Sequence, residues 1–79
     1  MVIQMTQSEI ALFLRKQRKE RDATMRQIGA EAGISAAQVS NAENPNDASR
    51  ISTREILLRH YGYKMEAVYN VSPLSASSN

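Results

Sequence analysis

Residues 24–44 read TMRQIGAEAGISAAQVSNAEN and hold two helix start signals on either side of a helix stop signal. Thr24 and Gln27 match the capping box T-x-x-Q, whose side chains satisfy backbone groups that a helix start leaves unpaired. A second such box, S-x-x-Q, begins at Ser35. Between the two boxes, Gly33 supplies the positive φ that a helix end favours. The stretch therefore predicts two short helices joined by a tight turn, which is a helix-turn-helix.

Small and apolar residues form the predicted inner faces of these two helices, and small residues allow helices to approach closely. They are Ile28, Gly29 and Ala32 in the first helix, Ile34 at the corner, and Val39 and Ala42 in the second helix.

A third capping box, T-x-x-E at Thr6, predicts a preceding helix from about Gln7 to about Arg21. Asp22 follows this helix, and aspartate tolerates a left-handed turn better than most residues do. The inner face of the helix is expected to carry Ile10, Phe13, Leu14 and Gln17.

Residues 44–49, NPNDAS, have no periodicity and predict a loop. A last helix follows, for which Ser52 or Thr53 is the expected cap and Gly62 the expected end. Its core side is expected to carry Ile56, Leu57 and Tyr61.

The period changes in residues 63–69, YKMEAVY, where the first five residues alternate between apolar and charged as in a half-buried strand. Because the other predicted elements are helical, we expect the strand to pair with its copy in a second chain across a two-fold axis. A C-terminal helix packed within the monomer is the alternative. Residues 71–79 are Ser-rich and predict a disordered tail after a single domain of residues 1–70. The predicted dimer strand carries Tyr63, Met65, Ala67 and Tyr69.

The composition bounds the protein class. With 79 residues, 42% of them hydrophobic, the chain can build one small core. It has no cysteine, which excludes a disulfide framework and a thiolate metal site. No apolar run reaches the roughly 18 residues of a membrane span, and the N-terminus lacks the regions of a signal peptide. We therefore expect a cytoplasmic protein without a membrane segment.

The net charge is only +2, but cations gather in residues 15–26, where two acids accompany them. Alone, such a run indicates the solvated face of a helix. Beside a helix-turn-helix, it also favours attraction to phosphates. The cations are Arg15, Lys16, Arg18, Lys19, Arg21 and Arg26.

The spacing of Gly29, Gly33 and Val39 resembles that of the Cro/repressor helix-turn-helix family, also called the XRE family. The segments LRKQRKERDAT before the motif and SNAEN at its end are also similar to this family. The resemblance implies a mainly α, four- to five-helix, lambda repressor-like DNA-binding domain, here with the short C-terminal strand for dimer pairing. It also implies a bacterial or phage-encoded protein. Together with the loop NPNDAS and the segment YGYKMEAV, the chain is most similar to HipB-like antitoxins.

Base contacts are expected from the exposed face of the second motif helix, because a recognition helix enters the major groove of DNA. Gln38 and Asn41 can each form a bidentate pair with adenine, and an alanine methyl can pack on that of thymine. Gln38 also has a capping role, whereas Asn41 has none. The candidates are Ala36, Ala37, Gln38, Ser40 and Asn41.

Phosphate contacts are expected where helix starts present free amides and where cations flank the motif. The similar family usually has glutamine at the positions of Met25 and Ala36, which this sequence lacks. The operator would then be read with fewer hydrogen bonds in each half-site. The phosphate candidates are Thr24, Met25, Arg26, Ser35 and Asn44.

Arg18 and Glu43 match a pair that forms an internal salt bridge in the similar family. His60 is the single histidine, and we interpret it as a surface or interface residue because no second metal ligand accompanies it. Neither a metal nor another cofactor is expected. The scattered carboxylates and the absence of a glycine-rich phosphate loop also argue against an enzyme.

These features predict a transcriptional repressor that binds double-stranded DNA at a palindromic operator as a homodimer. The resemblance adds the role of antitoxin and autoregulator in an operon with a HipA-type kinase toxin. One alternative is a phage or plasmid Cro-like regulator without a toxin partner. Another is a protein-interaction module that has kept the fold and lost DNA binding.

Overall fold

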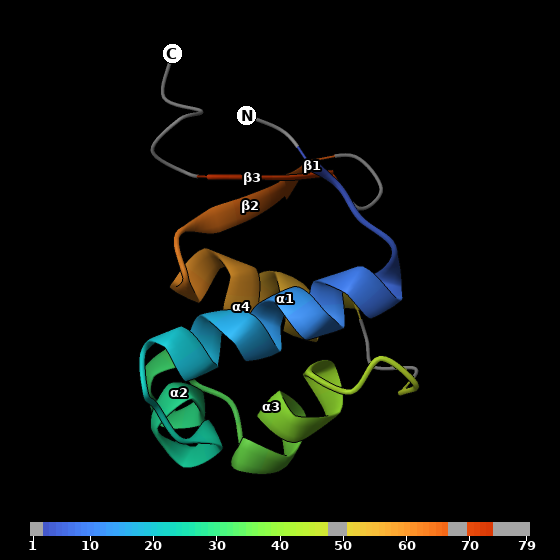
Figure 1. Cartoon of the computed structure of the whole chain (residues 1–79). Coiled ribbons are helices and arrows are strands. Elements are labelled where there is room, and N and C mark those ends of the chain that lie inside the picture. Colours follow the sequence, from blue (N-terminus) through green and yellow to red (C-terminus); the bar gives the residue numbers. More distant parts are fainter. Residues whose placement is uncertain (1–2, 48–50, 67–69, 74–79) are drawn as a thin grey trace.

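A computed structural model of the chain describes residues 3–47, 51–66 and 70–73, in which helices predominate and short strands form a small sheet (Figure 1). The four helices within these ranges are α1 (Gln7–Glu20), α2 (Met25–Ala32), α3 (Ala36–Ala42) and α4 (Ile51–His60). The strands are β1 (Ile3–Gln4), β2 (Tyr63–Glu66) and β3 (Asn70–Pro73).

Three helices begin at complete capping boxes, with Thr6 before α1, Thr24 before α2 and Ser35 before α3. In each box, the cap side chain accepts a hydrogen bond from the backbone amide of the third helical residue. The side chain of that third residue accepts a hydrogen bond from the backbone amide of the cap. The predicted helix α4 is present, but its predicted cap was wrong. This helix includes Ile51, so Ser52 and Thr53 lie inside its first turn and do not cap it.

Left-handed backbone occurs at the predicted turns. Asp22 has a φ of 52° after α1, and Gly33 has a φ of 79° after α2. Gly29 is needed for a different reason, which is the close approach of α3. A Cβ atom there would lie 2.7 Å from the carbonyl oxygen of Ile34. Gly33 therefore allows the bend between α2 and α3, and Gly29 allows the close approach of the two helices.

The core lies where α1, α2, α3 and α4 meet and extends to β3. Ile56 was wrongly predicted to face it, since this side chain is 41% exposed. Leu58, two residues after Ile56, is instead fully buried together with Leu57. The buried cluster comprises Ile10, Leu14, Ile28, Val39, Ala42, Leu57, Leu58, Tyr61 and Val71.

The strands form one antiparallel sheet in the order β1-β3-β2, with Met65 and Ile3 each opposite Val71. The prediction that β2 would find no partner in its own chain was therefore wrong. Its partner is β3, which includes residues 71–73 of the predicted disordered tail. Val71 is 2% exposed and belongs to the core, which anchors this strand on the helices. Residues 74–79 of that predicted tail lie outside the described residues.

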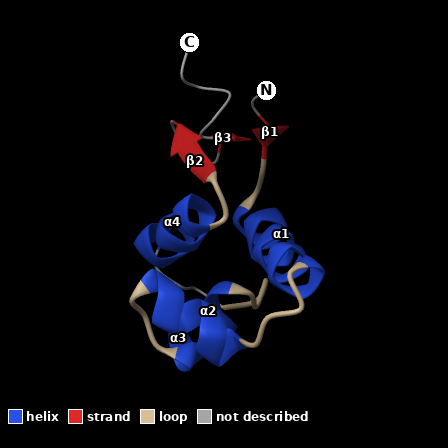
Figure 2. Cartoon of the chain, turned by 90° about the vertical axis from the view of Figure 1, so that its left-hand side faces the viewer, coloured by secondary structure: helices blue, strands red, loops and turns tan. Residues whose placement is uncertain are grey.

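The sheet covers α1 and α4 at the end of the molecule opposite α2 and α3, as both views show (Figures 1 and 2). Tyr63 and Met65 pack against the core of their own chain, and the Tyr63 ring meets that of Phe13 edge-on at 5.0 Å. Their apolar alternation is thus explained without a second chain. Ala67 and Tyr69 lie outside the described residues.

None of the helices in residues 3–47 and 51–66 is long and apolar enough to cross a membrane.

Candidate nucleic-acid interface

The outer face of α3 presents all five side chains that the sequence proposed as base contacts. Each of them is exposed, while Val39 and Ala42 on the opposite face are fully buried. This separation is a consequence of the 3.6-residue helical period. The exposed set is Ala36, Ala37, Gln38, Ser40 and Asn41.

Gln38 and Asn41 differ in what their side chains already do. The Oε1 atom of Gln38 accepts a hydrogen bond from the Ser35 amide at 2.9 Å. A bidentate pair with adenine uses both the oxygen and the nitrogen of an amide, so Gln38 would have to share its oxygen or leave the cap. Within the described residues, the Asn41 side chain has no bonding partner, so both of its amide atoms can face a base.

The proposed phosphate contacts are also not equivalent. The Met25 side chain packs partly against the core and carries no hydrogen-bond donor. Only the backbone amide of Met25 could therefore donate to a phosphate. Arg26 is exposed. The hydroxyls of Thr24 and Ser35 accept capping hydrogen bonds at 3.0 and 3.1 Å, which leaves their own O–H groups to donate. Asn44 is exposed and its Oδ1 accepts from the Asn46 amide, leaving its NH₂ group as donor.

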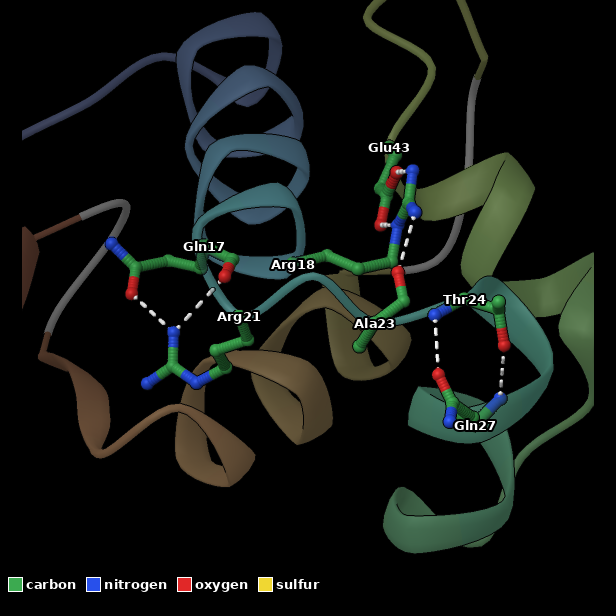
Figure 3. A network of polar contacts seen from close by, with 7 residues as sticks. All are labelled: Gln17, Arg18, Arg21, Ala23, Thr24, Gln27 and Glu43. Carbon is green, nitrogen blue, oxygen red and sulfur yellow. Dashed lines mark hydrogen bonds and ion pairs between the residues drawn. The ribbon is translucent and has the colours of Figure 1, made fainter.

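Arg18 and Glu43 form the predicted ion pair, which joins the end of α1 to the end of α3 (Figure 3). The guanidinium donates from Nε and Nη2 to the two carboxylate oxygens at 2.8 and 3.0 Å. Its Nη1 donates to the carbonyl of Ala23 in the turn before α2 at 2.9 Å. The hydrogen bond with Glu43 raises the pKa of Arg18 above its usual value, and burial opposes this shift. One arginine thus fixes the turn, α1 and α3 relative to one another.

Arg54 is a second buried arginine that holds α3, and sequence reasoning missed it. It is 1% exposed, on the core side of α4. Its guanidinium donates to the carbonyls of Ala42 at 3.0 Å and Asn44 at 3.1 Å, and to the Gln7 side chain. A cation three residues before Leu57 could have given the signal, because i and i+3 share a helix face. Charged side chains are so seldom buried that exposure was the natural expectation.

Tyr61 lies close to the Arg18–Glu43 pair and is 5% exposed. Among the described residues its hydroxyl has no hydrogen-bond partner. Burial, reinforced by the negative charge of Glu43, raises the pKa of Tyr61 to about 12. The Arg21 guanidinium covers the ring at 4.7 Å from its centroid and is held by two hydrogen bonds to Gln17 (Figure 3).

His60 contacts a carboxylate on another helix. Its Nε2 atom lies 2.9 Å from a carboxylate oxygen of Glu31, which connects α4 to α2. In the part of the chain that the structure describes, no three His, Cys, Asp or Glu residues gather in a way that could hold a metal ion.

A shallow depression of about 270 Å³ lies between α1 and α3, beside the exposed face of α3. We call it the α1–α3 depression. Arg15 and the Arg18–Glu43 pair line it, together with Met25, Ser40, Asn44 and Pro45. Small-molecule sites usually measure about 300 to 1,000 Å³, so this depression suits one group of a larger ligand better than a whole small molecule.

Comparison with known proteins gives no match: no family model, curated protein or solved structure matches this chain. The resemblance to the Cro/repressor family therefore rests on the residues of the motif and its flanks.

Proposed function

We propose that the protein is a sequence-specific DNA-binding transcriptional repressor that acts as a homodimer on a palindromic operator. The observation that carries this proposal is the capped α2–α3 pair. It presents an exposed polar and small-residue face on α3, while the opposite face is locked in the core. A helix presented in this way fits the major groove, which admits one α-helix and exposes a distinct pattern for each base pair.

The two buried arginines that hold α3 in place support this function. A base-reading helix must keep its orientation when it meets DNA, and Arg18 and Arg54 fix α3 from two different helices. Asn41 is the side chain best placed to read adenine, because its amide is exposed and has no structural role in the described part of the chain. Ala36 and Ala37 offer methyl groups for contact with thymine.

The homodimer is proposed from the position of β2 in the sheet. With the order β1-β3-β2, the outer edge of β2 has no neighbour among the described strands. Such an edge can pair with another chain through its backbone groups. Two copies joined by β2 would share one sheet across a two-fold axis, and two-fold related recognition helices bind half-sites about 34 Å apart.

The test is selection of bound duplexes from random DNA, with the mass of the protein–DNA complex measured in parallel. The proposal expects a palindromic consensus, two chains per duplex and an affinity that falls steeply with salt. Absence of salt-dependent binding to the selected pool at micromolar protein would refute DNA binding. A monomer on a single half-site would refute only the dimer.

The antitoxin role rests on the resemblance to HipB-like proteins and stays a prediction. A HipA-like kinase encoded beside this chain, and its co-purification with the protein, would support that role. An integrase or lysis gene in that place would instead favour a phage regulator.

A further inference from the structure

We propose that the α1–α3 depression is a phosphate-binding subsite for the DNA backbone, with Arg15 as its cation. This inference rests on the proposed function and deepens it, because it assigns a backbone contact to α1, which the helix-turn-helix itself does not include. The ligand group is a phosphodiester of the strand that flanks the bases read by α3.

The charge of the depression depends on Arg15. Arg18 also lines the site, but its guanidinium is bound to both oxygens of Glu43, so this pair contributes little net charge. Arg15 is exposed, and among the described residues it has no carboxylate partner. One uncompensated cation therefore faces a depression that is otherwise neutral.

The donors around the depression fit an anion with several acceptor oxygens. Arg15 offers a planar fork of N–H groups, a geometry that matches phosphate. Asn44 contributes a side-chain NH₂ group whose companion oxygen is occupied by the Asn46 amide. Ser40 of α3 lines the same space, and its hydroxyl is a further donor. This places Ser40 with the backbone contacts, whereas Asn41 remains a candidate for reading bases.

The other cations of α1 provide the comparison. Lys16 and Lys19 line a separate open depression on the outer side of α1, together with the exposed Leu12. Of the α1 cations in that outer depression, only Arg15 also lines the one beside α3. A general attraction to DNA would use Lys16 and Arg15 equally, and a specific subsite would not.

The experiment compares Arg15→Gln with Lys16→Gln in the full chain, on the duplex obtained by selection, at several salt concentrations. Both variants remove one charge from an exposed position of the same helix, and glutamine has a helix propensity close to that of lysine and arginine. In each half-site, Arg15→Gln should weaken binding about fivefold to tenfold and reduce the log–log salt slope by about 0.9, so the slope for the homodimer should fall by about 1.8. Lys16→Gln should change the slope by less than about half as much.

Two further results complete the test. Arg15→Lys should restore the salt slope, because the charge returns. Arg15→Gln should weaken binding to all sequences by a similar factor, which marks a backbone contact. Equal slopes for Arg15→Gln and Lys16→Gln, or a changed base preference in Arg15→Gln, would overturn the subsite while leaving the proposed function intact. A wild-type protein that binds no DNA would overturn both.

Discussion

Replacing Gly29 with alanine adds a single methyl group at the closest approach of α2 and the start of α3. The new Cβ atom would lie 2.7 Å from the carbonyl oxygen of Ile34, 3.2 Å from the carbonyl carbon of Ser35 and 3.3 Å from the amide of Ala36. These are backbone atoms and cannot rotate away. The Ile34 amide also donates to the carbonyl of Gly29 at 2.9 Å, so moving the turn would strain that hydrogen bond.

The magnitude follows from two opposing effects. Overpacking a closely packed site costs about 1 to 3 kcal/mol, and the backbone contacts place this substitution near 3 kcal/mol. Alanine is better than glycine inside a helix by about 1 kcal/mol. The expected net loss is about 2 kcal/mol, a large share of the roughly 4 to 12 kcal/mol that a domain of this size has.

The assay is urea unfolding followed by circular dichroism, combined with DNA binding by the variant under native conditions. With a slope of about 1 kcal/mol per molar urea, Gly29→Ala should lower the midpoint by about 2 M. Because α3 must shift, DNA affinity should fall further than the folded fraction does. Gly33→Ala is the control, since no atom lies within 4 Å of its Cβ position. Only the left-handed φ is penalised there, by about 1 kcal/mol. Wild-type stability in Gly29→Ala would refute the proposed close approach.

Three further predictions test the supporting framework and the base reader. Glu43→Gln leaves Arg18, whose side chain is 12% exposed, without its counter-charge and should cost about 3 kcal/mol in urea unfolding. The double variant Arg18→Met/Glu43→Leu should lose less than this, so a larger loss would contradict the argument. Tyr61→Phe should be at least as stable as wild type at pH 7, because it removes a hydroxyl that is unpaired among the described residues. Since burial raises the pKa of Tyr61 to about 12, wild-type stability is fully present below pH about 10 and falls as the pH rises toward 12, whereas Tyr61→Phe lacks this loss. Stability curves of wild type and Tyr61→Phe that stay parallel above pH about 10 would contradict this assignment. Asn41→Ala should weaken DNA binding by about 1 to 3 kcal/mol at one base position, measured with single-base operator variants, and an equal loss on all sequences would show that Asn41 does not read a base.

The local elements could be predicted because their causes are local. A capping box involves residues three positions apart, so Thr6, Thr24 and Ser35 reveal three helix starts without knowledge of the fold. The left-handed turns at Asp22 and Gly33 were likewise readable from residue type. The candidate contact face of α3 followed from the helical period alone.

The pairing of β2 could not be predicted in the same way. Its partner β3 reads as a polar, Ser-rich segment, and the one residue that anchors it in the core is Val71. A single buried residue leaves no periodicity in a sequence. The apolar alternation of Tyr63 and Met65 suggested a second chain, although these side chains pack on their own core.

Sequence alone determined the capped helices, the turns between them and the side of α3 that is exposed, because hydrogen bonds and side-chain periodicity within a few residues decide these features. Tertiary structure decided the rest. The burial of Arg54 beneath the end of α3, the sheet made from both ends of the chain, and the depression between Arg15 and Asn44 all join residues distant in sequence. Their stability depends on which surfaces meet when the core closes, and no local pattern encodes that choice.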